Sequence, residues 1–211
     1  MSKENGQKDL YVLAADQDMV ETIHGLLENH ARLGIRPINY AIAKHIQRDP
    51  GCRTDASQYL RGRIHEYKYA LVVFDRNGCG DDSSREEIQR TVAHDLATNG
   101  WRDRSRVVVI DPELEPWIWN GSNQAPKVLG WPGGYERLKA WLVNEGRWPS
   151  SSNKPPDPKK ALRAVLSERK QSVSSRLFGE LARSITLRRC EDPAFAELKE
   201  TLHRWFPPMH S

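Results

Sequence analysis

Apolar runs of strand length alternate with helical patterns over the first 110 residues, and this alternation limits the folds open to the chain. Four segments have the character of strands: 10–15, 35–46, 69–74 and 106–110. Helical patterns lie between or after them, at 16–34, 54–67 and 83–100. Strands that alternate with helices form a mainly parallel sheet covered by helices on both faces. We therefore expect an α/β fold.

The pattern changes after Asp111. Five of the seven tryptophans fall between residues 112 and 149, where the stretch YERLKAWLVNEG (135–146) has the pattern of an amphipathic helix. The stretch SSSNKPPDP (150–158) is rich in Ser and Pro and has the composition of a linker. We expect a boundary between two parts of the chain at this point.

A basic helical extension is predicted beyond the linker. Three helices are expected there, at 158–169, 173–184 and 193–205. Residues 154–211 contain 12 Lys and Arg against 7 Asp and Glu, whereas residues 1–153 contain 20 against 21. The surplus of positive charge therefore lies in the last quarter of the chain. We divide the chain into an α/β domain at residues 1–150 and a basic helical extension at residues 151–211.

Several classes of protein are disfavoured by the sequence. No run of about 18 apolar residues occurs, which excludes an obvious membrane-spanning helix, and the stretch MSKENGQKDL lacks the apolar run of a signal peptide. We therefore expect a cytoplasmic protein with no membrane partner. The cysteines are too few and too widely spaced for a disulfide framework or a zinc knuckle: Cys52, Cys79 and Cys190. No P-loop or dinucleotide-binding motif is present.

Carboxylates follow three of the predicted strands. They are Asp16 and Asp18, then Asp75, then Asp111, Glu113 and Glu115. In an open parallel sheet, ligands bind beyond the carboxyl ends of the strands, and Mg²⁺ prefers hard oxygen ligands of this kind. The group of acids therefore suits a magnesium site. Aspartate is also common at strand ends as a turn former or helix cap, and this alternative stays open for each acid taken singly.

Three short motifs carry a resemblance to a known family. LYVLAADQD (10–18), VVFDRNG (72–78) and DPELEPWIW (111–119), in this order and spacing, resemble the TOPRIM-like families of small bacterial proteins. These are relatives of the TOPRIM domains of topoisomerases, primases and overcoming-lysogenization-defect nucleases. Many are encoded beside phage-defence genes, including methylation-associated defence clusters. The resemblance covers roughly residues 9 to 120.

The resemblance implies a TOPRIM-like fold, a Mg²⁺ cofactor and a set of site residues. The implied metal ligands are Asp75, Asn77, Asp111, Glu113 and Glu115. Asp16 or Asp18 would act as general base toward a metal-bound water. The chain would then be a Mg²⁺-dependent nuclease or phosphodiesterase acting on DNA or RNA.

The chain departs from the family pattern where the chemistry is concentrated. The Glu-Gly pair that the family places after its first strand falls on Ala14 and Ala15, so the usual proton-transfer carboxylate is missing. The Asp-x-Asp motif becomes Asp75-x-Asn77, which replaces one charged metal ligand by an amide. These departures favour a degenerate, nucleic-acid-associated subunit of an antiphage-defence system that acts with other defence proteins.

Basic and aromatic side chains supply further candidates. The predicted nucleic-acid contacts are Lys159, Lys160, Arg163, Arg188 and Arg189, for which an ordinary solvated surface is the alternative. Glu113 and Glu115 alternate with Leu114, and Trp117 and Trp119 stand on either side of Ile118. We expect these two tryptophans to pack in the core, and base stacking beside a metal is the alternative.

Overall fold

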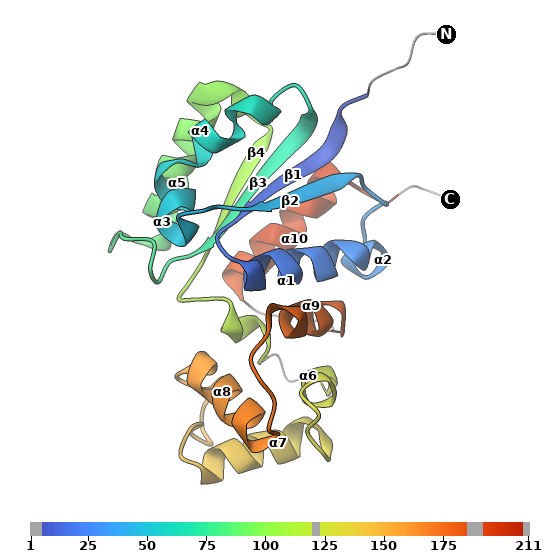
Figure 1. Cartoon of the computed structure of the whole chain (residues 1–211), viewed down its shortest axis with the longest axis vertical. Helices are drawn as coiled ribbons and strands as arrows, with labels where there is room; N and C mark the ends of the chain where they lie inside the picture. Colours follow the sequence, from blue (N-terminus) through green and yellow to red (C-terminus); the bar gives the residue numbers. More distant parts are fainter. Residues whose placement is uncertain (1–5, 120–122, 185–191, 209–211) are drawn as a thin grey trace.

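A central parallel sheet organises the computed structural model, which describes residues 6–119, 123–184 and 192–208. Its four strands are β1 (Lys8–Ala14), β2 (Tyr40–Lys44), β3 (Tyr67–Asp75) and β4 (Ser105–Ile110). They lie in the order β2-β1-β3-β4 and are all parallel (Figure 1). The expected α/β fold with a parallel sheet is confirmed.

Helices cover both faces of this sheet, which explains why its central strands are apolar throughout. One face carries α1 (Gln17–Glu28) and α10 (Pro193–Trp205), with the short α2 (His30–Leu33) beside α1. The other face carries α3 (Arg48–Thr54), α4 (Ala56–Leu60), η1 (Arg61–Arg63), α5 (Arg85–Leu96) and η2 (Ala97–Trp101). In β3 every side chain from Ala70 to Phe74 is fully buried. Strands enclosed on both faces require continuous apolar runs of this kind.

A second, purely helical layer lies beyond the carboxyl ends of the strands (Figure 1). It contains α6 (Gln124–Val128), α7 (Gly134–Asn144) and α8 (Pro158–Glu168), and it follows a single turn, η3 (Glu115–Trp117). Trp119 and Trp148 pack edge to face in this layer with their ring centroids 5.6 Å apart. Trp117 and Trp119 are 3% and 1% exposed, which confirms that they are core residues.

The C-terminal helices connect the two layers. Helix α9 (Ser175–Ser184) packs on α1, where a Cβ atom added to Gly25 would lie 2.5 Å from the carbonyl oxygen of Gly179. Helix α10 packs on the sheet, and Trp205 stacks on Tyr69 with the ring centroids 4.5 Å apart. Residues 151–211 therefore contribute one helix to the helical layer, one to the junction and one to the α/β sandwich.

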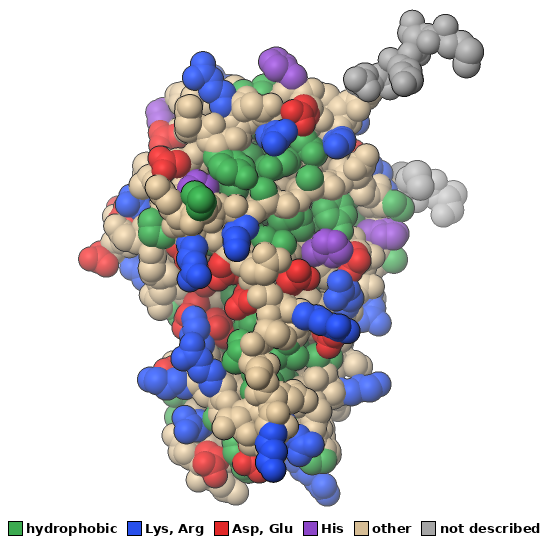
Figure 2. All heavy atoms as spheres, in the orientation of Figure 1, with side chains coloured by type: hydrophobic (Ala, Val, Ile, Leu, Met, Phe, Trp, Pro, Cys, Tyr) green, Lys and Arg blue, Asp and Glu red, His purple; other side chains and the backbone are tan. Residues whose placement is uncertain are grey.

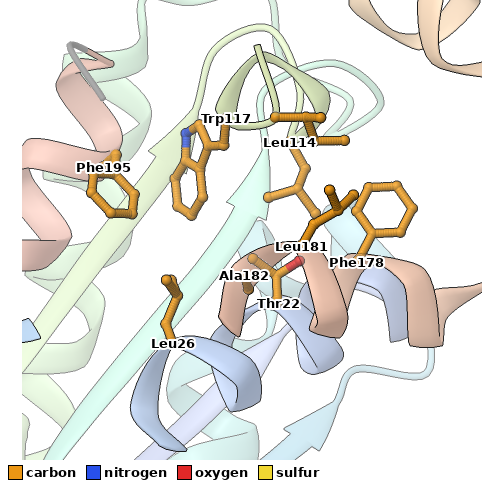
Figure 3. Close-up of a pocket in the computed structure, with 9 residues that line it drawn as sticks. Thr22, Leu26, Leu114, Trp117, Phe178, Leu181, Ala182 and Phe195 are labelled. Atoms are coloured by element: carbon orange, nitrogen blue, oxygen red, sulfur yellow. The ribbon is translucent and has the colours of Figure 1, made fainter. Parts of the chain in front are cut away.

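An apolar cavity of about 20 Å³ marks the junction of the two layers. Figure 3 shows Leu26 of α1, Phe178 of α9, Phe195 of α10 and Trp117 around it. Trp117 and Phe195 meet edge to face at 5.1 Å. The side chains come from segments that are far apart in the sequence, so the two layers share one continuous hydrophobic core.

Local signals account for most helix ends. Asp16 caps α1 through a hydrogen bond from the Met19 amide, and Ser84 forms a reciprocal capping box with Glu87 at the start of α5. The expected helix at 54–67 is shorter and is preceded by α3, which contains Pro50 in its first turn. In the described part of the chain, no helix combines the length and apolarity needed to cross a bilayer.

Candidate functional site

The centre of the candidate site is the point where β1 and β3 end side by side. The chain leaves β1 toward one face of the sheet and β3 toward the other, so this is a topological switch point. Ligands in open α/β sheets bind at such points, outside the carboxyl ends of the strands. Asp16 follows β1, Asp75 is the last residue of β3, and Asp49 reaches the same place from α3.

Asp75 has an unusual environment for a carboxylate. Its Oδ1 is buried and has no hydrogen-bond partner among the described residues, although the side chain as a whole is partly exposed. Burial raises the pKa of Asp75 well above its usual value, and the negative charges of Asp49, Glu115, Asp16 and Glu113 raise it further. Without an added positive charge, Asp75 therefore tends to hold its proton.

Asp49 is the member of the site that sequence reasoning missed. Its Oδ1 accepts a hydrogen bond of 2.8 Å from the backbone amide of Asp75. Burial raises the pKa of Asp49, and the charge of Asp16 adds to the increase, while the hydrogen bond from Asp75 acts in the opposite direction. The available signal was its position, because Asp49 is the first acid after β2 just as Asp16 is after β1.

Glu113 and Glu115 approach the same end of the sheet, but they have a cationic partner. The Nζ of Lys159 in α8 lies 2.7 Å from Oε2 of Glu113 and 3.5 Å from Oε1 of Glu115. Glu115 is only 6% exposed, and burial raises its pKa while Lys159 partly offsets this effect. Burial lowers the pKa of Lys159, but its hydrogen bond to Glu113 and the charges of both glutamates outweigh burial and raise it.

We call Asp16, Asp49, Asp75, Glu113 and Glu115, together with Lys159, the acidic rim. The charge of each of the other four acids acts on Asp75, and that of Asp75 acts on Lys159. Lys159 was predicted to contact nucleic acid, and the structure places its ammonium group inward on two carboxylates. It is a protonated counter-ion for the rim.

Three of the predicted acids have hydrogen-bond or ion-pair partners of their own. Asp18 accepts a hydrogen bond of 2.5 Å from the hydroxyl of Ser175, and Asp16 is occupied in part by the Met19 amide at 2.9 Å. Asp111 is 41% exposed and pairs with Arg76 at 3.5 Å.

Asn77 is exposed, and its backbone amide donates to the carbonyl of Pro112 at 3.0 Å. The structure therefore brings Asp16, Asp75, Glu113 and Glu115 together. It gives Asp18, Asn77 and Asp111 other surroundings.

The acids present fit a metal ion only in part. Within residues 6–119, 123–184 and 192–208, no group of three His, Cys, Asp or Glu side chains is placed to hold one. The unpartnered Oδ1 of Asp75 suits a cation, and Asp49 and Asp16 have no ion pair among the described residues, although the charge of Arg48 acts on Asp49. Glu113 and Glu115 are already neutralised in part by Lys159. A metal ion would thus need the carboxylates to rearrange.

Among the predicted basic contacts, Lys160 and Arg163 lie together, apart from the carboxylates that hold Lys159. Lys160 pairs with Asp157 at 2.9 Å, and both Lys160 and Arg163 line an open groove that includes none of the rim residues. Arg188 and Arg189 lie outside the described residues. Comparisons with known proteins add no identification, because no protein-family model, curated protein or solved structure matches this chain.

Proposed function

We propose that this chain is a nucleic-acid-associated, partner-dependent subunit of an antiphage-defence system, built on a degenerate TOPRIM-like domain. The observation that carries the proposal is the position of Lys159, whose ammonium group lies between Glu113 and Glu115. A lysine in this place supplies internally the positive charge that a metal ion would bring to the rim. The rim can then be stable without any cofactor.

The surroundings of Asp75 support the same proposal. Burial and neighbouring negative charges raise the pKa of Asp75, and a protonated carboxyl group is a poor ligand for a hard cation. Ala14 and Ala15 stand where the family has its proton-transfer pair, and both are fully buried. A site that lacks its general base loses about 10²-fold to 10⁴-fold in rate from that change alone.

A second function, that of a Mg²⁺-dependent phosphodiesterase, is favoured by one observation. The buried Oδ1 of Asp75 has no hydrogen-bond partner among the described residues, and such atoms are rare unless an ion or water satisfies them. Asp75 and Asp49 would hold the ion once the carboxylates had rearranged. The bound ion would polarise a phosphoryl oxygen and lower the pKa of a water molecule. The capping carboxylate of Asp16 would position that water.

An assay of cleavage and metal binding distinguishes the two functions. Purified wild-type protein would be incubated with Mg²⁺ or Mn²⁺ and with single-stranded, duplex and methylated DNA and RNA. The proposal expects no cleavage above background and no change in melting temperature with either metal, because a ligand stabilises only a state that it binds. Cleavage that is abolished in Asp75→Asn and retained in the loop variant Asp82→Asn would establish the phosphodiesterase instead.

The same assay on Lys159→Ala tests whether the lysine replaces a metal ion. We expect this variant to gain a melting-temperature increase with Mg²⁺ that the wild type lacks, since two glutamates lose their internal cation. Lys160→Ala is the matched control, because its neighbour Asp157 is exposed and far less dependent on a partner. If Mg²⁺ leaves the melting temperature of Lys159→Ala unchanged, Lys159 does not occupy the place of a metal ion.

A further inference from the structure

An open groove of about 400 Å³ runs between α7 and α8 in the helical layer. Trp141 of α7 lines one side, and Arg147 follows the end of that helix. Lys160, Arg163 and Ser167 line the other side at intervals of three and four residues, which places them on one face of α8. Glu145 and Glu168 also line the groove. It is separate from the acidic rim, which faces the sheet.

The cations of the groove are available to a ligand. Within the described residues, neither Arg147 nor Arg163 has a carboxylate at ion-pair distance, and both are exposed. Lys160 pairs with Asp157, but its side chain is 73% exposed, so solvent screens this pair strongly. Figure 2 shows Lys and Arg side chains dispersed over the helical layer, with fewer Asp and Glu side chains among them, on the face it presents. Phosphate groups are the anions that arginine binds best.

An aromatic surface accompanies these cations. Trp141 is only partly buried, and its ring centroid lies 4.7 Å from that of Trp131, which is also partly buried. By contrast, Trp101, Trp119 and Trp148 are almost completely enclosed in the core. A tryptophan that stays accessible beside three cations has the features of a stacking platform for an unpaired base.

We propose that the α7–α8 groove binds single-stranded nucleic acid. Arg147, Lys160 and Arg163 contact successive phosphates, and a base stacks on Trp141. A duplex fits this surface poorly, because its bases are already stacked on one another and cannot reach an aromatic side chain in the groove. The inference rests on the proposed association with nucleic acid, and it names the surface and the class of strand.

The charges of the groove set the strength and salt dependence of binding. Three phosphate contacts on a single strand give a slope of about −2 for the logarithm of the binding constant against the logarithm of salt concentration. Glu145 and Glu168 oppose three cations with two negative charges. We therefore expect modest affinity in which stacking contributes a large part, and a smaller salt slope than a fully basic surface would give.

Fluorescence anisotropy with the full chain tests the groove. The probes would be labelled oligo(dT) and oligo(rU) of about 15 nucleotides and a duplex of equal length, matched to the size of a single-strand site. We expect single strands to bind more tightly than the duplex. Arg163→Ala should weaken binding at least about fivefold and reduce the magnitude of the salt slope by about 0.7, as the loss of one phosphate contact on a single strand does.

Matched variants distinguish binding in the groove from non-specific attraction of nucleic acid to basic side chains. Arg169→Ala changes an exposed arginine at the end of the same helix but outside the groove, and it should bind like the wild type. Trp141→Phe should retain more affinity than Trp141→Ala, with circular dichroism confirming that both variants fold. Only a stacking role predicts that order among folded variants.

Three outcomes would overturn the inference in distinguishable ways. Equal binding by the wild type and Arg163→Ala would show that the groove is not the binding site, while the proposed association with nucleic acid would remain. Tighter binding of poly-glutamate than of oligo(dT) would assign the groove to an acidic peptide. No binding of any strand by the wild type would overturn both the groove and the nucleic-acid part of the proposed function, while cleavage of bound strands would overturn the non-catalytic part alone.

Discussion

Lys159 and Arg163 lie one turn apart on α8, yet they belong to two regions with opposite electrostatic designs. Lys159 faces the acidic rim, where its charge is matched by Glu113 and Glu115. Arg163 faces the α7–α8 groove, where no described carboxylate lies at ion-pair distance from it. In the rim, the cation is paired with carboxylates of the same chain. In the groove, the cation is free to pair with a ligand. The sign of a side chain's charge therefore does not reveal its role, whereas the position of its partner does.

The largest loss of stability is expected where α9 packs on α1 at the junction of the two layers. The variant Gly25→Ala tests this contact. In a helix interior, Gly to Ala normally stabilises by about 0.5 to 1 kcal/mol. Here the added Cβ would lie 2.5 Å from the Gly179 carbonyl oxygen, so we expect a loss of about 3 kcal/mol in the free energy of unfolding. Urea denaturation would measure it, and Gly62→Ala, with no atom within 4 Å of its added Cβ, is the control. A neutral result would mean that α9 shifts freely on α1.

Removing the counter-ion of the rim should have the next largest effect. Lys159→Ala leaves Glu113 and the nearly enclosed Glu115 without their cation. Breaking a fully buried pair costs about 3 to 5 kcal/mol, and the 41% exposure of Lys159 reduces this to about 2 kcal/mol. Lys160→Ala should change stability by less than about 0.5 kcal/mol. Equal losses in the two variants would show that the rim does not depend on Lys159.

The protonation of Asp75 gives the rim a characteristic pH dependence. The pKa of Asp75 is raised in the folded protein, so the unfolded chain loses this proton first as pH rises. The wild type therefore loses stability as pH rises from the usual carboxyl pKa through the folded-state value. Each tenfold difference in proton affinity corresponds to about 1.4 kcal/mol.

Asp75→Asn removes this ionisation while keeping the shape of the side chain. We expect its stability relative to the wild type to increase as the pH rises above the usual range of a carboxyl pKa, and to level off above the folded-state pKa of Asp75. Thermal denaturation at a series of pH values would measure the difference, with Asp82→Asn as an exposed control. A constant difference across the series would contradict a raised pKa at Asp75.

A substitution in the groove should have the smallest effect on the free energy of unfolding. Arg163→Ala removes an exposed side chain that has no ion-pair partner among the described residues, so the free energy of unfolding should change by less than about 0.5 kcal/mol. Its effect on binding should be far larger than its effect on folding. A stability loss comparable to that of Lys159→Ala would place Arg163 in the structural network and weaken its assignment to a ligand.

Local patterns were sufficient for most of the fold. The apolar run at residues 69–74 could only be a buried strand, and β3 spans it; the helices expected at 158–169 and 193–205 lie within a residue of α8 and α10. The helix α3 was not predicted because Pro50 and Gly51 resemble a turn. Gly51 is needed for packing, since a Cβ there would lie 2.0 Å from the His45 ring.

The candidate site was predictable only in its strand-end acids. Asp16 and Asp75 follow strands, so the topology alone brings them together. The pairing of Lys159 with Glu113 joins residues 46 positions apart and depends on how α8 docks, which no local pattern encodes. Trp141 was equally hidden, because it flanks the buried residues Tyr135, Leu138 and Leu142 of α7 and shares their helical spacing.

The position of α10 has a consequence for synthesis of the chain. All four strands have been made once residue 110 is complete, but the helix that covers β3 and β4 on one face ends at Trp205. Until that helix emerges from the ribosome, Tyr69 lacks the indole ring that stacks on it, and an apolar face of the sheet is open to water. The nascent chain must therefore carry an unfinished sheet while the segment from Ile110 to Trp205 is made, a period in which chaperones have an exposed surface to bind.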